Sequence, residues 1–118
     1  MAIEYVDVNQ HLRRITLSGR LDTAGSEEIA TKFAALAASA RRGVVVDLTD
    51  VTFLASMGLR SIIANAKAQQ HRGGRLVLLV GSNESVTKTL TATGIDSLIP
   101  MFTDSGGAEE AALDYAPG

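Results

Sequence analysis

Ser56 is the first residue in this chain to suggest chemistry, because serine is the nucleophile of many hydrolases. Such a serine needs small residues two positions before and two positions after it, on a strained turn from strand to helix. Gly58 meets the second requirement, but Leu54 fails the first. A triad would also need His11 or His71, the only histidines, as the base, together with an orienting acid. The pattern argues against a hydrolase, and we expect no enzymatic activity.

Other catalytic and ligand-binding chemistries find little support in the 118 residues. The chain has no cysteine, which excludes disulfides, thiolate metal sites and cysteine nucleophiles. We expect His11 in a turn and His71 at a helix end, as solvated or capping side chains rather than metal ligands. No zinc-protease or phosphate-binding-loop motif occurs, and Gly73-Gly74 precedes a predicted strand instead of a helix. We therefore predict no metal and no cofactor.

Charge and composition also argue against nucleic acids and membranes as partners. Eleven Lys and Arg against thirteen Asp and Glu give a net charge of −2, and aromatic residues make up 4% of the chain. The basic pairs lie on different predicted elements and are interpreted as solvated: Arg13-Arg14, Arg41-Arg42 and Arg72/Arg75. Apolar runs such as Leu76–Val80 are too short to span a bilayer, and the N-terminus lacks a signal-peptide pattern. We expect a cytoplasmic protein without membrane insertion.

The position of Ser56 before a predicted helix over Met57–Arg72 allows two interpretations. As an N-cap, its hydroxyl would accept an N–H from the first helical turn and contribute about 1 kcal/mol. As a phosphoacceptor, it would hold a phosphate of about −1.5 to −2 charge near the positive end of the helix dipole. A partner would then meet an uncharged patch before modification and a dianion after it. The neighbours that form this patch are Leu54, Ala55, Met57 and Gly58.

The elements that position Ser56 follow from hydrophobic periodicity and from helix and turn signals. A hairpin of two strands is predicted first, and a loop and a helix follow it. Strands and helices then alternate to the end of the chain. The expected order is strands Ile3–Val8 and Leu12–Leu17, loop Gly19–Thr23, helix Ser26–Arg41, strand Val44–Leu48, helix Met57–Arg72, strand Leu76–Val80, a helix from Ser82-Asn83-Glu84 to Gly94, edge strand Leu98–Phe102 and helix Ser105–Tyr115.

This order predicts an α/β fold in a single domain over residues 1–118. We expect a mixed central sheet of about five strands with about four helices, mostly on one face. No repeat, low-complexity segment or long linker divides the chain.

Several segments together follow the pattern of one known family. The most specific is the run Phe-x-x-Ser-x-Gly-Leu at positions 53–59, between a strand and a helix. The matching segments are Gly19–Asp22, Val44–Leu48, Val51–Leu59, Gly73–Leu78 and Val86–Gly94. On these residues the chain resembles the STAS-domain anti-sigma factor antagonists over nearly its full length. The STAS fold that this resemblance implies agrees with the sheet and helices predicted from periodicity.

The resemblance implies a function in partner switching. Such a protein, when unphosphorylated, binds an anti-sigma factor that is also a serine kinase of the histidine-kinase-like ATPase type, and this frees the sigma factor. The kinase then phosphorylates the antagonist, the complex dissociates, and a serine phosphatase resets the switch. The resemblance makes Ser56 the phosphoacceptor and places Asp22 and Thr23 beside it at the partner surface. We expect a monomer or a weak dimer.

Two residues depart from the family pattern. Many antagonists carry an acidic residue immediately before the acceptor serine, where this chain has Ala55, and often Ser or Thr after it, where it has Met57. The first difference changes the local charge by one unit, and so bears on partner identity and on phosphorylation. Thr49 and Thr52 are fallback acceptors, which we expect in strand or turn positions that face a partner less directly.

Two alternatives belong to the same family. A stand-alone STAS subunit of a lipid-transport ABC complex would grip an ATPase without reversible phosphorylation. A scaffold component of a stress-sensing assembly would form very large particles. The motif serine Ser56 and the acidic loop residue Asp22 favour the switch over both.

Overall fold

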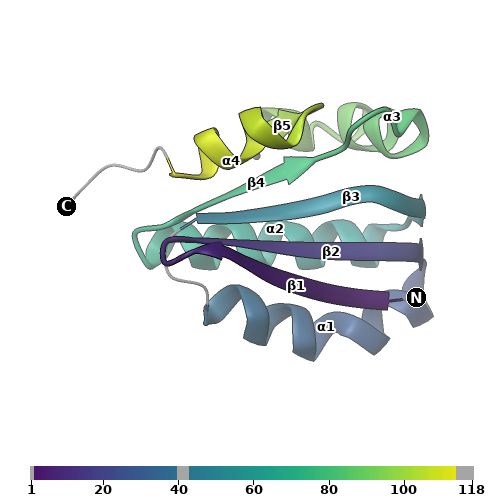
Figure 1. The fold of residues 1–118 in the computed structure, drawn as a ribbon. Helices are drawn as coiled ribbons and strands as arrows, with labels where there is room; N and C mark the ends of the chain where they lie inside the picture. Colours follow the sequence, from purple (N-terminus) through teal and green to yellow (C-terminus); the bar gives the residue numbers. More distant parts are fainter. Residues whose placement is uncertain (1, 40–42, 114–118) are drawn as a thin grey trace.

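The computed structural model describes residues 2–39 and 43–113, which form five strands and four α-helices around one sheet (Figure 1). In chain order, the elements are β1 (Ala2–Asn9), β2 (Leu12–Leu21), α1 (Thr23–Ala38), β3 (Gly43–Leu54), α2 (Ser56–His71), β4 (Arg75–Leu79), α3 (Glu84–Ala92), the 3-10 turn η1 (Ile95–Ser97), β5 (Met101–Phe102) and α4 (Ser105–Leu113). This α/β arrangement with a mixed five-stranded sheet confirms the predicted fold class.

The strands lie in the sheet in chain order, β1-β2-β3-β4-β5. β1 and β2 are antiparallel and form the predicted hairpin, in which the Asn9 side chain accepts the backbone N–H of His11 at 2.8 Å. All other neighbours are parallel, as expected for strands joined by helical crossovers. The turn position predicted for His11 is confirmed.

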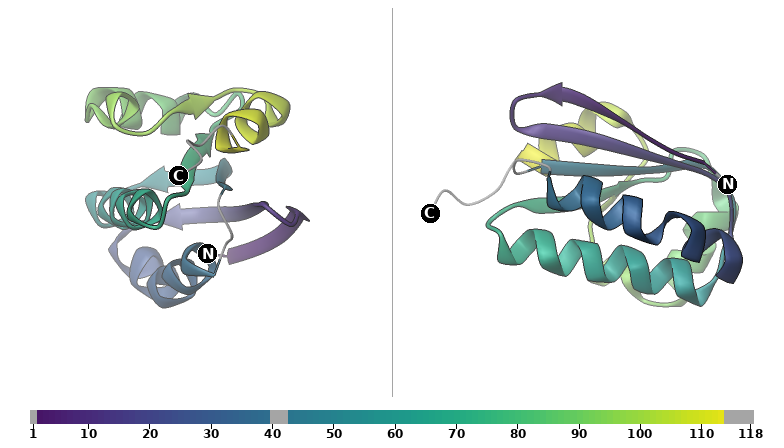
Figure 2. Two further views of the ribbon diagram at one scale, coloured as in Figure 1. Left: turned by 90° about the vertical axis from the view of Figure 1, so that its left-hand side faces the viewer. Right: turned by 90° about the horizontal axis from the view of Figure 1, so that it is seen from below.

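Two apolar layers cover the sheet, one on each face. Along β3, Val44, Val46 and Leu48 point into the larger layer, while Val45 points to the opposite side, as the alternation of a strand requires. The larger layer includes side chains of α1, α2 and α3, whereas Ala108 and Ala112 of α4 pack on the other face. The end-on view of Figure 2 shows α4 alone on its side of the sheet. The prediction that the helices lie mostly on one face is therefore confirmed.

Two predicted boundaries in the first half of the chain are wrong, because β2 and β3 both extend further than expected. β2 continues to Leu21, so the predicted loop Gly19–Thr23 shrinks to Asp22. β3 continues to Leu54 because two register shifts absorb the polar residues after Leu48. At the first shift, Asp47 accepts both the backbone N–H and the hydroxyl of Thr49, at 2.9 and 2.7 Å.

The remaining elements agree with the predictions apart from their ends. α1 begins at Thr23 rather than Ser26, and α2 begins at Ser56. The expected edge strand Leu98–Phe102 is reduced to Met101–Phe102, because the chain forms η1 before it. α4 is described as far as Leu113. The predicted helix ends at Arg41 and Tyr115, and the basic pair Arg41-Arg42, lie outside the described residues.

Candidate functional site

Four element ends meet at one end of the sheet, on the right in Figure 1. β2 and β3 finish there side by side, with Leu21 opposite Leu54, and α1 and α2 begin immediately after them. The backbone N–H of Ala55 donates to the carbonyl oxygen of Leu21 at 2.9 Å. This bond extends the strand pairing by one residue, and so brings the starts of α1 and α2 together.

Ser56 is the first residue of α2, and its side chain is exposed. The N-cap position belongs to Ala55, whose backbone is extended at φ −91° and ψ 171° and whose methyl group makes no capping bond. The interpretation of Ser56 as the N-cap is therefore wrong. The reason is that strand-like backbone runs through Ala55, which accepts the first helical N–H, from Leu59, at 3.1 Å. The Ser56 hydroxyl makes no hydrogen bond within the described part of the chain.

Asp22 joins the end of β2 to α1 and has a structural role of its own. Its Oδ1 accepts the backbone N–H of Gly25 at 2.8 Å and so caps α1. This bond holds the pKa of the Asp22 carboxyl below its usual range, and Arg20 contributes in the same direction. The Arg20 Nε lies 3.6 Å from Asp22 Oδ2. Asp22 is therefore a fixed negative charge at neutral pH, and exposed Thr23 follows it as the first residue of α1.

Arg20 and Phe53 lie at the same end of the sheet as Asp22 and Ser56, although the predicted site residues do not include them. They are paired across β2 and β3, and the Arg20 guanidinium lies 4.7 Å from the centre of the Phe53 ring. The Phe53 side chain is 42% exposed, and that of Met57 is 37% exposed. Two large apolar side chains thus lie on either side of Ser56 in the sequence without being buried in the core.

We call this group of residues the Ser56 surface. It combines two exposed hydroxyl-bearing residues, two exposed apolar side chains, one carboxylate and one cation. Its members are Arg20, Asp22, Thr23, Phe53, Ser56 and Met57.

The other predicted contact residues are less exposed than Ser56 and Met57. Leu54 and Gly58 are buried, and Ala55 is half-buried. Leu54 packs against Gly58, where an added β-carbon would approach its Cδ1 to 2.9 Å. Leu54 and Gly58 therefore hold the start of α2 in place beneath the Ser56 surface. Direct contact of these residues with a partner stays a prediction.

The fallback acceptors Thr49 and Thr52 both lie in β3, and both are exposed. Thr49 donates its hydroxyl to Asp47 at 2.7 Å, so it is already engaged.

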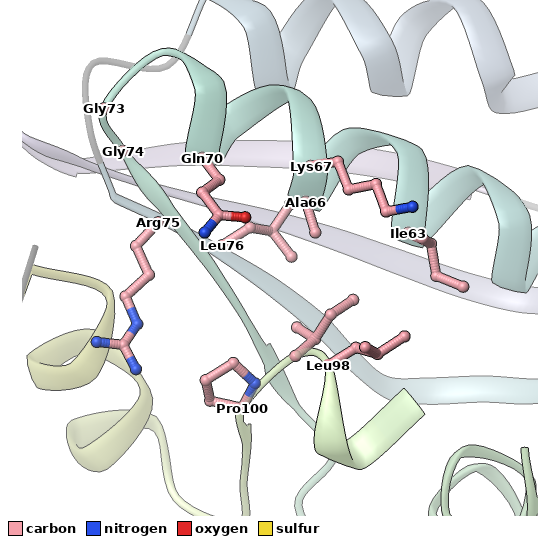
Figure 3. Close-up of a pocket in the computed structure, with 11 residues that line it drawn as sticks. Ile63, Ala66, Lys67, Gln70, Gly73, Gly74, Arg75, Leu76, Leu98 and Pro100 are labelled. Carbon is pink, nitrogen blue, oxygen red and sulfur yellow. The ribbon is translucent and has the colours of Figure 1, made fainter. Parts of the chain in front are cut away.

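A separate groove lies at the far end of α2, with a volume of about 570 Å³. Figure 3 shows Ile63 and Ala66 on one side of it and Leu98 and Pro100 on the other, with Lys67 at its edge. None of its lining residues belongs to the Ser56 surface.

Within residues 2–39 and 43–113, no group of three His, Asp or Glu side chains gathers closely enough to hold a metal ion. No α-helix in the described part of the chain is both long enough and apolar enough to span a bilayer.

Comparison with known proteins adds a family model and several solved structures. The model described as "STAS domain" matches residues 5–108. An anti-sigma factor antagonist from Mycobacterium paratuberculosis has a TM-score of 0.82 at 21% identity, covering 96% of each chain. The unphosphorylated anti-sigma factor antagonist SpoIIAA has a TM-score of 0.74 at 21% identity, covering 93% of this chain and 96% of its own.

The same fold also occurs among transporters. A sulfate transporter family protein from Wolinella succinogenes has a TM-score of 0.73 at 13% identity, covering 91% of this chain and 88% of its own. Among curated protein sequences, no match is found.

Proposed function

Because this chain belongs to the STAS domain family, we propose that it is an anti-sigma factor antagonist that is switched by phosphorylation of Ser56. In the unphosphorylated state it binds an anti-sigma factor that is also a serine kinase, and so releases the sigma factor. The observation that supports this proposal best is that Ser56 is exposed at the start of α2, between the exposed side chains of Phe53 and Met57. The hydrogen bond from Ala55 to Leu21 holds this helix start against β2.

The unphosphorylated Ser56 surface suits a protein partner. Phe53 and Met57 offer apolar area that is lost from water on binding. Arg20 and Asp22 supply one charge of each sign beside them and set the orientation of a complementary surface. The Ser56 hydroxyl is small and uncharged, so a partner that offers it one hydrogen bond can cover it at low cost.

Phosphorylation changes this surface without requiring any change of fold. The Ser56 Oγ forms a new O–P bond to the γ-phosphorus of ATP, the bond from that phosphorus to the β–γ bridging oxygen breaks, and ADP leaves with its electron pair. The hydroxyl proton passes to a base of the kinase. A charge of about −1.5 to −2 then stands between two apolar side chains and beside the ionised Asp22.

Covering that dianion would bury its charge in an interface shaped for a small hydroxyl, and the desolvation would oppose binding. A loss of about 3–4 kcal/mol of binding free energy would weaken affinity by two to three orders of magnitude, which is enough for a switch. A serine phosphatase would hydrolyse the O–P bond and restore the hydroxyl.

An affinity capture from source-cell lysate, analysed by mass spectrometry, tests the proposal. The baits are the wild type, Ser56→Ala and Ser56→Asp, with Ser105→Asp as the matched control. Ser105 is exposed and is the first residue of α4, so this control places the same charge at an equivalent helix position on the opposite face of the sheet.

We expect a histidine-kinase-like ATPase to be captured by the wild type, Ser56→Ala and Ser105→Asp, and to be lost with Ser56→Asp. The purified ATPase should transfer phosphate from ATP to the wild type and to Thr49→Ala and Thr52→Ala, but not to Ser56→Ala. A transporter ATPase held equally by all four baits would contradict the switch and would make the chain a structural subunit.

A further inference from the structure

Arg60 lies one helical turn after Ser56 on the same side of α2. Residues four apart in a helix are neighbours on its surface, and both of these side chains are exposed. Among the residues that the structure describes, Arg60 has no hydrogen-bond or ion-pair partner. The first turn of α2 contains no acidic residue. Arg60 is therefore a cation within reach of Ser56 whose side chain no other group restrains.

Arg60 has no negative partner within α2 while Ser56 is unmodified, because the first turn of the helix contains no carboxylate. A negative group at position i and a positive group at position i+4 form the favourable order of such a pair. A phosphate on Ser56 would create this order.

Arg20 is the cation of the Ser56 surface, but its guanidinium is already engaged. It contacts the carboxylate of Asp22 at 3.6 Å and the ring of Phe53 at 4.7 Å. For Arg20 to bind a phosphate on Ser56, it would have to give up those contacts, whereas Arg60 would give up only solvent. A planar guanidinium can also donate two parallel N–H groups to phosphate oxygens.

We propose that Arg60 is the intramolecular counter-ion of phosphorylated Ser56 and positions the phosphate along α2. This inference rests on the proposed phosphorylation of Ser56. It adds a second change to the switch, because modification both adds a dianion and withdraws the Arg60 cation from a partner. A kinase that binds the Arg60 side chain in the unphosphorylated chain then loses that contact when the phosphate is added.

The test compares the full chain with serine and with phosphoserine at position 56, the latter installed by genetic-code expansion so that no kinase is needed. Each form is prepared in the wild type, in Arg60→Gln and in Lys67→Gln. Lys67 is an exposed cation on the same side of α2, close to the groove of Figure 3. At about 1.5 Å per residue it lies about 16 Å along the helix from Ser56, beyond the reach of a phosphate. It therefore serves as the matched control.

Urea unfolding measures the coupling. We expect the effect of phosphorylation on the unfolding equilibrium constant to differ between the wild type and Arg60→Gln by about two- to fivefold, in the direction that stabilises the phosphorylated wild type. Lys67→Gln should respond to phosphorylation as the wild type does, and Arg60→Lys should recover part of the effect. Equal responses in the wild type and Arg60→Gln would overturn the proposal.

NMR provides a second readout that does not depend on global stability. The Nε–Hε resonance of Arg60 should shift when Ser56 is phosphorylated, and that of Arg20 should shift less. An unshifted Arg60 resonance would also overturn the inference. Neither measurement uses a partner or a kinase, so a failure here leaves the proposed function intact, and a failure to capture a kinase leaves this coupling measurable.

Discussion

Gly58 of α2 and Ser26 of α1 approach so closely that a β-carbon added to Gly58 would lie 3.2 Å from Ser26 Oγ. The Ser26 side chain is buried, and its hydroxyl has no hydrogen-bond partner among the described residues. The same added β-carbon would lie 2.9 Å from Leu54 Cδ1 and 3.2 Å from Leu21 Cβ. Absence of a side chain at Gly58 therefore allows α1 and α2 to begin side by side, directly beneath the Ser56 surface.

Gly58→Ala should destabilise the protein, although alanine favours helices more than glycine does. The added methyl group meets Leu54, Leu21 and Ser26 all within 3.2 Å, so we expect an overpacking cost in the upper part of the range of about 1–3 kcal/mol, above the gain in helix propensity of about 1 kcal/mol. Urea unfolding measures the change. Gly106→Ala is the control, because its β-carbon would have no contact closer than 3.5 Å, so this variant should be neutral or stabilised. Equal responses at the two glycines would contradict the packing argument.

Ala55→Ser should stabilise the protein, whereas Ser56→Ala should change its stability by less than about 0.5 kcal/mol. Ala55 has the extended backbone of an N-cap and lacks a side chain that can accept an N–H. A serine there would contribute about 0.5–1 kcal/mol, measured from the free energy of unfolding in urea. A substantial loss of stability in Ser56→Ala would show that Ser56, rather than Ala55, caps α2.

Asp22 should make folding stability depend on pH in the acidic range. Its pKa is lowered in the folded chain, mainly by the bond from the Gly25 N–H. The resulting stabilisation is fully present above the unfolded pKa of about 3.9, and is lost as the pH falls through the lower folded pKa. Asp22→Asn keeps an acceptor oxygen for Gly25 but cannot ionise. Urea unfolding at a series of acidic pH values should show the wild type losing stability relative to this variant, and parallel curves would refute the assignment.

Phe53→Ser and Met57→Ser should each weaken binding of the captured partner at least tenfold while leaving the fold intact. Both side chains are large, apolar and partly exposed, so they add little to the core but offer area to a partner. Leu98→Ser is the matched control, because Leu98 is 67% exposed and lies at the other end of α2. Calorimetry with the purified partner measures the affinities. A similar loss of affinity with Leu98→Ser would show that the interface is not confined to the Ser56 surface.

The pattern of apolar residues was sufficient to predict most of this fold. The alternation in Leu12–Leu17 and the apolar run Val44–Leu48 predicted two neighbouring strands that the structure contains. The extension of β3 beyond Leu48 could not be predicted in this way, because it depends on register shifts against β2. It also depends on Asn83, whose side-chain amide donates to the carbonyl oxygens of Leu48 and Val51 at 3.0 and 2.7 Å. Asn83 is distant from both residues in the sequence.

The location of Ser56 between a strand and a helix was predictable, but its surroundings were not, and its functional role stays a prediction. The strand-to-helix motif indicated that location, yet the identity of the N-cap depended on the bond from Ala55 to Leu21, which forms only when β2 and β3 pair. Arg20 and Phe53 were missed for a similar reason. Their contact follows from a register shift between Gly19 and Arg20, and no spacing along the sequence reveals it.

The pairing of every strand with its neighbour in the chain has a consequence for folding. Such an order means that each strand can pair with one already synthesised as soon as its own segment has emerged, although the parallel pairs join residues as far apart in the sequence as Leu12 and Gly43. Every residue of the Ser56 surface precedes β4, so the ribosome synthesises all of that surface before β4, α3, β5 and α4. We therefore expect the start of α2 to be held against β2 and α1 early in synthesis, with the later elements adding onto a hairpin and crossover that already exist.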